Sequence, residues 1–224
     1  MKAYSVYRNT NYKVELTGGS VVVYDSNDNL KFKINKLKYA YTGRFKPNSN
    51  IFIVRTDSSL LMLDIEKEVV THKVKVKNVN TLNDHECTFN NDGSIFYNIE
   101  STTNVEFRIA LYSGSDLSFI EYIYGPTNMS TVTSIEIDND DIYVLVSYRN
   151  KQRVASEHYI GLLKNNEIIN KVPISEVELF SIVRDRNYFL NGITQMYNFW
   201  HLVGMNKEIN PLNQSLKNIY LSKC

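Results

Sequence analysis

Short apolar segments alternate with short polar turns along most of the chain, and apolar side chains within a segment often recur with a period of two. Such alternation is typical of β-strands with one buried face. A strand is predicted to end at Phe45, a polar turn occupies residues 47–50, and a β-branched strand fills residues 51–54. Two further strands are predicted at residues 60–65 and 69–76. We therefore expect an antiparallel unit of four short strands here.

The same four-stranded pattern recurs along the chain. Its copies can be aligned on the residue near the end of each first strand, namely Tyr7, Phe45, Phe89, Ile137 and Val183. These positions are 38, 44, 48 and 46 residues apart. The approximate repeats are residues 1–36, 37–80, 81–126, 127–174 and 175–224.

A period of about 40–50 residues with four short strands per copy is what a β-propeller blade needs. One such unit cannot bury both of its apolar faces alone, but units stacked around an axis bury these faces against their neighbours. We predict an all-β chain that forms a single β-propeller of about five four-stranded antiparallel blades. The last repeat supplies its own outer strand at residues 217–222, so side-chain packing closes the ring. A β-sandwich, stacked meanders, or a half ring that dimerises are the alternatives.

Segments such as residues 45–54 and 60–65 resemble β-propellers of the WD40-like and YVTN-like kind. The resemblance is generic and covers nearly the whole chain. No Gly-His and Trp-Asp pair recurs as in WD40 blades, and no Asp-box of the sialidase kind is present. The resemblance implies a rigid ring of blades, with partners docking on the face that carries the loops between blades.

Composition supports strands and excludes some classes of partner. Sixteen Tyr and ten Phe favour strand over helix. Lys and Arg total 25 against 24 Asp and Glu, so the basic excess expected of a nucleic-acid-binding protein is missing. The chain has neither a secretory signal at residues 1–7 nor an apolar run that would span a bilayer, which predicts a cytoplasmic protein without a membrane partner. The abundant Asn and Lys suggest a low-GC bacterial genome.

No cofactor, metal or nucleophile site is predicted. His72, His85, His158 and His201 are scattered without the spacing of zinc ligands. Cys87 has no catalytic signature around it and is predicted to be buried in an inner strand. No Gly-x-Ser-x-Gly motif and no phosphate-binding loop occurs, so no catalytic residue is assigned.

Carboxylates near strand ends leave one enzymatic alternative open, because some five-bladed propellers are glycoside hydrolases with acids at the central axis. The candidate carboxylates are Asp57, Asp84, Glu86, Glu136 and Glu178. Hydrolysis needs two carboxylates at a defined separation, which sequence does not reveal. Asp57 is most simply a turn residue, and Glu136 is expected at a solvated position of its strand.

The longest turn within a repeat is predicted at residues 147–158, between the second and third strands of the fourth repeat. Its Tyr, Arg, Lys and His side chains suit contacts with an acidic partner. An aromatic cluster at the equivalent turn of the fifth repeat suits an interface anchor. The partner-binding residues predicted from the two segments are Tyr148, Arg149, Lys151, Arg153, His158, Tyr197 and Trp200.

These features favour a non-catalytic binding or scaffold module that recognises a protein partner through the loop face of a small propeller. An interaction or immunity-type protein of a bacterium fits the size of the chain and its lack of a reactive constellation. The alternative is a carbohydrate-binding or glycoside-hydrolysing five-bladed propeller, whose ligand would be a glycan or another small molecule.

Overall fold

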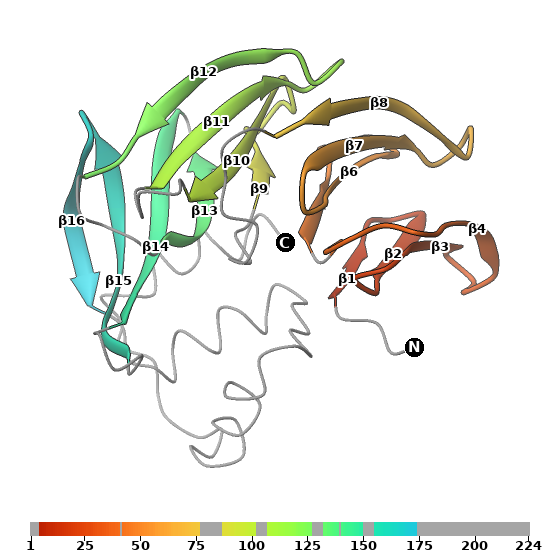
Figure 1. The fold of residues 1–224 in the computed structure, drawn as a ribbon, viewed down its shortest axis with the longest axis horizontal. Helices are drawn as coiled ribbons and strands as arrows, with labels where there is room; N and C mark the ends of the chain where they lie inside the picture. The colour runs from red at the N-terminus through yellow and green to blue at the C-terminus, as the bar shows by residue number, and fades with distance from the viewer. Residues whose placement is uncertain are drawn as a thin grey trace.

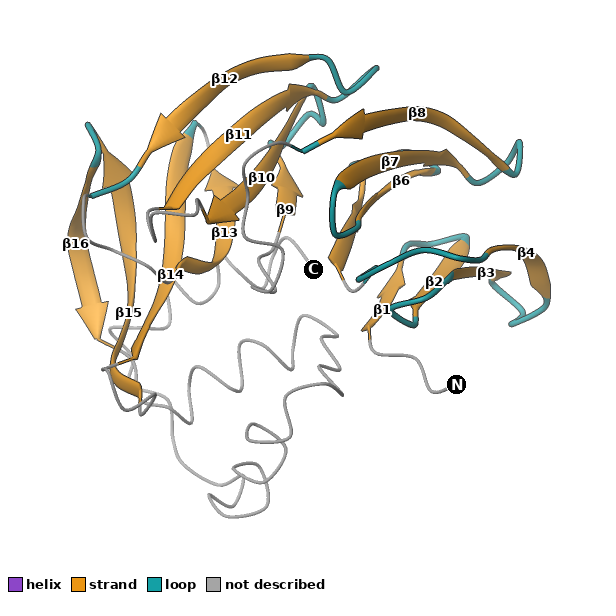
Figure 2. Cartoon of the chain, viewed as in Figure 1, coloured by secondary structure: helices purple, strands orange, loops and turns teal. Residues whose placement is uncertain are grey.

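A computed structural model describes residues 5–40, 42–76, 87–101, 107–126, 132–138, 140–149 and 155–173. Within these ranges the chain forms sixteen β-strands and no helix (Figure 2). Consequently, the described part contains no helix of the length and hydrophobicity required to cross a membrane. The expected all-β fold class is confirmed.

The strands make four antiparallel sheets, and in every sheet the strands pair in chain order. The first sheet contains β1 (Ser5–Arg8), β2 (Tyr12–Leu16), β3 (Val21–Asp25) and β4 (Leu30–Ile34). The second contains β5 (Thr42–Phe45), β6 (Ile51–Arg55), β7 (Ser59–Asp64) and β8 (Val69–Lys75). The third contains β9 (Cys87–Phe89), β10 (Ile95–Ser101), β11 (Phe107–Ser113) and β12 (Phe119–Tyr124). The fourth contains β13 (Val132–Asp138), β14 (Asp141–Arg149), β15 (Ala155–Lys164) and β16 (Glu167–Pro173).

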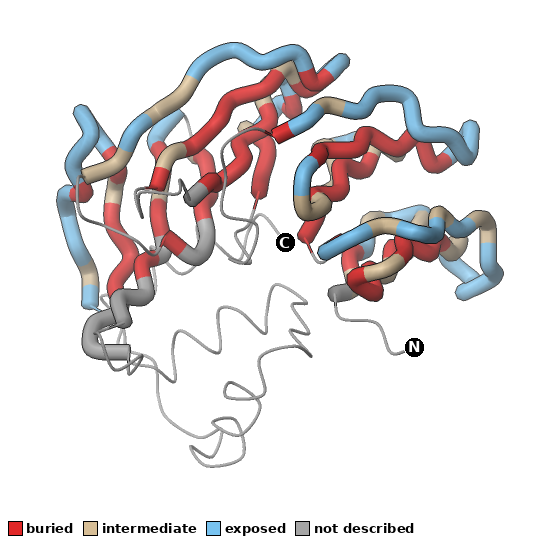
Figure 3. The backbone as a smooth tube through the Cα atoms, viewed as in Figure 1, coloured by how far each residue is buried: buried red, intermediate tan, exposed pale blue. Residues whose placement is uncertain are grey.

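The four sheets are arranged like blades around a common centre (Figure 1). The first strands of the sheets lie innermost, where β1 contacts β5, β5 contacts β9 and β9 contacts β13. The outermost strands β4, β8, β12 and β16 form the exposed rim, while most buried residues lie on the inner and middle strands (Figure 3). Each sheet falls within one of the first four sequence repeats. The fifth repeat, residues 175–224, lies outside the described residues.

Three apolar cores hold neighbouring sheets together, one between each consecutive pair. The core between the first and second sheets contains Leu16 and Phe52. The core between the second and third sheets contains Ile53 and Phe96, and the core between the third and fourth contains Ile99 and Val144. Because successive side chains of a strand point to opposite faces, one strand such as β6 serves two cores, with Phe52 and Val54 on one face and Ile53 on the other.

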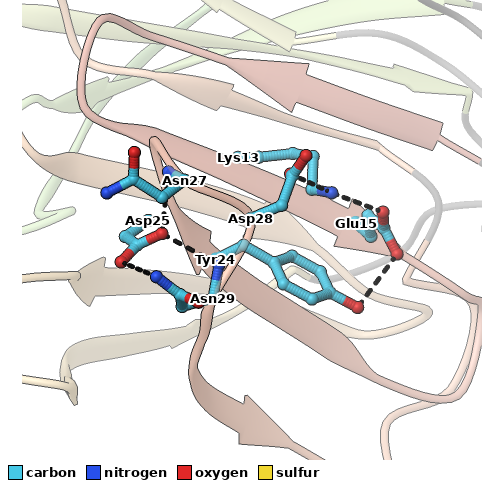
Figure 4. A network of polar contacts seen from close by, with 7 residues as sticks. All are labelled: Lys13, Glu15, Tyr24, Asp25, Asn27, Asp28 and Asn29. Carbon is cyan, nitrogen blue, oxygen red and sulfur yellow. Dashed lines mark hydrogen bonds and ion pairs between the residues drawn. The ribbon is translucent and has the colours of Figure 1, made fainter.

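Polar side chains shape the turns that connect the strands. In the turn between β3 and β4, the Asp25 carboxylate accepts hydrogen bonds from the backbone N–H groups of Asn27 and Asn29, at 2.8 and 2.9 Å (Figure 4). Asp28, in the left-handed region with φ of 62°, forms an ion pair with Lys13 of β2 (Figure 4). Asx-type bonds of this kind stabilise short reversals, so the polar turns in the sequence were good predictors of strand ends.

Candidate functional site

A pocket with a volume of about 700 Å³ lies at one end of the innermost strands of the four described sheets. Its lining comes from the ends of β1, β5 and β9, from the three turns that follow these strands, and from Glu136 of β13. We call it the axial pocket. All four described sheets contribute to it, so the pocket exists only because the blades are assembled.

An ion pair joins two sheets at the bottom of the axial pocket. The Arg44 guanidinium of β5 donates through Nη2 to Glu136 Oε1 of β13 at 2.9 Å. Thr88 Oγ1 of the intervening strand β9 donates to the second carboxylate oxygen, Glu136 Oε2, at 3.2 Å. The Glu136 side chain is only 1% exposed and that of Arg44 only 13%. Both carboxylate oxygens of Glu136 therefore accept hydrogen bonds, and these bonds connect the inner strands β5, β9 and β13.

The turns that wall the pocket are held in shape by their own side chains. Asn9 Oδ1 accepts hydrogen bonds from the backbone N–H groups of Asn11 and Tyr12, at 3.0 and 2.8 Å. Asn90 Oδ1 accepts from the backbone N–H of Ile95 at 2.9 Å. Asn9 Nδ2 also donates to the Ser49 carbonyl at 3.3 Å, which links the turns of the first two sheets. The wall is therefore preorganised.

The axial pocket carries an excess of positive charge. Arg8, Arg44 and Lys46 line it together with a single carboxylate, Glu136. Arg44 is engaged by Glu136, whereas neither Arg8 nor Lys46 has a carboxylate within ion-pair distance in the described part of the chain. Lys46 Nζ donates to the Gly114 carbonyl of the third sheet at 3.0 Å. The two cations at the mouth of the pocket, Arg8 and Lys46, thus have no ion-pair partner among the described residues.

A second polar cluster lies between the second and third sheets, toward the opposite end of β10. The Glu100 carboxylate accepts hydrogen bonds from Arg108 Nε at 2.9 Å and Asn98 Nδ2 at 3.1 Å. Burial raises the pKa of Glu100, and the bonds from Arg108 and Asn98 oppose this effect. Burial also raises the pKa of Tyr112, with a further contribution from the neighbouring Glu100 charge. The cluster has no residue in the axial pocket, and its burial indicates a structural role.

The sequence prediction for Glu136 was wrong. It was expected at a solvated position, but the residue is completely buried. Its polar neighbours come from β5 and β9, and Arg44 lies 92 residues away in the sequence. Local alternation could not reveal a partner at such a distance.

Of the other carboxylates considered for hydrolysis, Asp57 occupies the turn between β6 and β7, away from the axial pocket. Asp84, Glu86 and Glu178 lie outside the described residues. Among the described residues that line the pocket, Glu136 is the sole carboxylate. A pair of catalytic acids is therefore not assembled in this part of the structure.

The described residues contain no group of three or more His, Cys, Asp and Glu side chains that would hold a metal ion. Cys87, predicted to be buried in an inner strand, is 2% exposed in β9. His85, beside it in the sequence, lies outside the description.

The predicted partner-binding loop is shorter than expected. Strand β14 continues through Tyr148 to Arg149, and β15 resumes at Ala155, with Ser147 paired to His158. The polar side chains suggested a loop, but such residues are tolerated in a strand when cross-strand pairing continues. The structure describes the backbone of Tyr148, Arg149 and His158 but not their side chains. The remaining predicted binding residues, Lys151, Arg153, Tyr197 and Trp200, lie outside the described residues.

The predicted loop and the axial pocket lie at opposite ends of the sheets. In an antiparallel sheet, the turn after the first strand and the turn after the second strand are at opposite ends. The pocket is formed at the first kind of turn and the predicted loop is of the second kind. Sequence reasoning therefore missed the pocket. The available signal was the recurrence of Asn-rich turns, preceded by a cation in the first two repeats, directly after the first predicted strand.

Comparison with solved structures confirms the propeller architecture. Over 78% of this chain, hydrazine synthase from Kuenenia stuttgartiensis matches with a TM-score of 0.61 and 14% identity. The WD40 domain of Neurospora crassa Pan2 matches over 77% with a TM-score of 0.55 and 12% identity. A chain of the mitotic checkpoint complex matches over 64% with a TM-score of 0.51 and 12% identity. The chain is thus a β-propeller of the WD40-like kind in its fold.

These likenesses establish the fold alone, because the sequence identities are low. The match spans 49%, 52% and 45% of the three solved chains, so this chain accounts for about half of their length. No protein-family model and no curated protein sequence matches the chain.

Proposed function

We propose that the chain is a non-catalytic binding module that recognises a protein partner through its propeller. The observation that carries this proposal is the axial pocket, whose polar wall is preorganised by turn hydrogen bonds and whose only described carboxylate is engaged in an ion pair. A rigid scaffold that presents turns around a central depression is suited to recognition. One of the structurally similar chains comes from a multiprotein assembly, the mitotic checkpoint complex, which supports the same reading.

The particular form we propose is a cytoplasmic interaction or immunity-type protein of a bacterium. The predicted residues Tyr148, Arg149, Lys151, Arg153 and His158, with Tyr197 and Trp200, stay a second candidate contact surface. A glycosidase is disfavoured because its mechanism needs two carboxylates at a set separation, whereas the described pocket lining supplies one that is already bonded.

Affinity purification from the native host, followed by reconstitution with the purified partner, tests the proposal. Thr10→Trp places a bulky side chain in the exposed turn at the pocket, and we expect it to weaken a partner that uses the pocket. Ser58→Trp makes the same change in an exposed turn at the opposite end of the sheets and is the matched control.

A third variant with Arg149, Lys151 and Arg153 all changed to Ala reports on the predicted loop. Loss of affinity in this variant alone would place the interface on the loop side of the propeller. Failure to recover any partner, together with turnover of a chromogenic glycoside by the intact chain, would contradict the binding-module proposal.

A further inference from the structure

The two cations at the mouth of the axial pocket define which chemistry the pocket would accept. Arg8 is exposed at the end of β1, and Lys46 is half-buried just after β5. The nearby Asp28 carboxylate is already paired with Lys13. The hydrogen bond from Lys13 is the main cause that lowers the pKa of Asp28, and the charge of Arg8 contributes less. Arg8 is therefore not neutralised by its own sheet, and the mouth favours an anionic ligand.

The bottom of the pocket has no net charge, and both carboxylate oxygens of Glu136 already accept hydrogen bonds. Arg44 and Glu136 balance each other in charge, and Thr88 occupies the second oxygen of Glu136. A cationic ligand would have to approach two cations at the mouth and find no free carboxylate among the described lining residues. The charges of the described lining residues therefore favour an anionic ligand over a cationic one.

The dimensions and the spread of the cations favour a chain segment over a compact ion. A volume of about 700 Å³ is in the range of sites that take up small ligands or a few side chains, and it is too small for a folded domain. Arg8 ends a strand of the first sheet and Lys46 follows a strand of the second, while Asn90 and Asn91 line the pocket from the third with amides that donate to Ser94 and Asp138. Cations from two different sheets match separate carboxylates along a peptide better than they match one phosphate group.

From these observations we propose that the axial pocket binds an acidic peptide segment, with Arg8 and Lys46 each pairing with a Glu or Asp carboxylate of the ligand. This inference rests on the proposed function and specifies the part of the protein partner that enters the pocket. The amides and hydroxyls of the surrounding turns line the path of the peptide. The Arg44–Glu136 pair maintains the shape of the pocket bottom without contributing net charge.

The test is a titration of the full chain with a capped peptide of alternating glycine and glutamate, monitored by calorimetry or by backbone NMR shifts. A peptide with glutamine at every glutamate position is the matched ligand control. We expect the glutamine peptide to bind at least about tenfold more weakly, because charge-assisted hydrogen bonds are lost. The affinity for the glutamate peptide should also fall as salt is raised, since the cations at the mouth are partly exposed.

Variants of the two cations separate charge from folding. The double variant Arg8→Gln with Lys46→Gln should lose about tenfold in affinity for the glutamate peptide, whereas Arg8→Lys with Lys46→Arg should retain it. Lys33→Gln removes an exposed cation of β4 that does not line the pocket, and it should bind like the unchanged chain. Equal binding by the double Gln variant and the unchanged chain would overturn the inference.

Three further outcomes are decisive. If inorganic phosphate displaces the peptide or binds more tightly than it, the pocket is an anion site of another class and the peptide inference is wrong. If the purified protein partner binds the double Gln variant and the unchanged chain equally, the inference fails while the proposed binding function stands. If neither a partner nor the peptide binds, both proposals fail.

Discussion

Arg44 and Glu136 show how one pair of residues supports an arrangement of several strands. Their contact joins β5 to β13, and Thr88 of β9 adds a bond to the same carboxylate. A buried ion pair is a modest net stabiliser, because both charges lose their hydration. Removing one partner is costly for the same reason, since the other charge is then left in a poorly solvated place.

Replacement of Arg44 by Met should therefore destabilise the chain by about 3–5 kcal/mol, the range for a buried charge left without its partner. Urea unfolding at neutral pH measures this loss. The exposed Arg8→Gln should cost much less, and the double variant Arg44→Met with Glu136→Gln should recover part of the stability. An Arg44→Met variant as stable as Arg8→Gln would show that the pair contributes nothing to the fold.

Glu100 gives the fold a pH dependence of a defined sign. Burial raises its pKa above the ordinary value of 4.5 that applies to the unfolded chain. Between these two pKa values the folded state holds a proton that the unfolded state has released, so folding stability falls as pH rises. The stabilisation is fully present below about pH 4.5 and is lost as pH rises through the raised pKa.

The variant Glu100→Gln removes this titration. We expect the stability of the unchanged chain, relative to Glu100→Gln, to decrease as pH is raised from 4.5 through the mildly acidic range. Urea unfolding at a series of pH values measures the difference, and Glu121→Gln on the exposed side of β12 controls for the loss of a surface carboxylate. A relative stability that increases over this range would contradict the assigned pKa direction.

Among the strands, close packing around β5 depends on a residue without a side chain. A Cβ added at Gly43 would lie 2.4 Å from Phe52 Cζ and 2.6 Å from the Ile53 carbonyl oxygen. Phe52 is fully buried in the core between the first two sheets. The backbone N–H of Gly43 also donates to the Tyr7 hydroxyl at 3.2 Å, which ties β5 to the first sheet.

Gly43→Ala should therefore cost about 1–3 kcal/mol, the usual penalty for overpacking a core. The comparison variant is Gly19→Ala, because a Cβ at Gly19 would meet no atom within 4 Å. Thermal unfolding of the two variants provides the measurement. Equal melting temperatures would mean that Phe52 moves aside without cost, and the close approach at Gly43 would then have no energetic importance.

The strands and turns were largely predictable from sequence because the signals are local. Alternation, β-branched residues and Asn- or Asp-containing turns placed most strands of the first four repeats within a few residues. The boundaries of β14 and β15 were missed because polar side chains resembled a loop, whereas cross-strand pairing extends the hairpin. The axial pocket was missed for a different reason. Its residues come from four repeats, and only the packing of the assembled sheets brings Arg44 close to Glu136.

At the scale of the whole molecule, the fourth sheet has a buried residue that lies outside the three apolar cores. Ile160 of β15 is completely buried, yet it is not part of the core between the third and fourth sheets. Its neighbours in β15, Tyr159 and Leu163, do belong to that core, so alternation directs Ile160 to the opposite face of the sheet. This burial supports the proposal that the chain is a single domain in which residues 175–224 form a fifth blade.

If the fifth repeat completes the ring, a chain that ends at Pro173 should lose the cover of the Ile160 face. We expect the full chain to be a monomer of 26.0 kDa that unfolds in a single transition. The shortened chain should self-associate and melt at a lower temperature, because an exposed apolar sheet face promotes association. Light scattering and calorimetry on both chains measure these properties. A full chain of twice the expected mass would instead indicate a ring completed by dimerisation, and a shortened chain as stable and monomeric as the full one would show that residues 175–224 fold outside the ring.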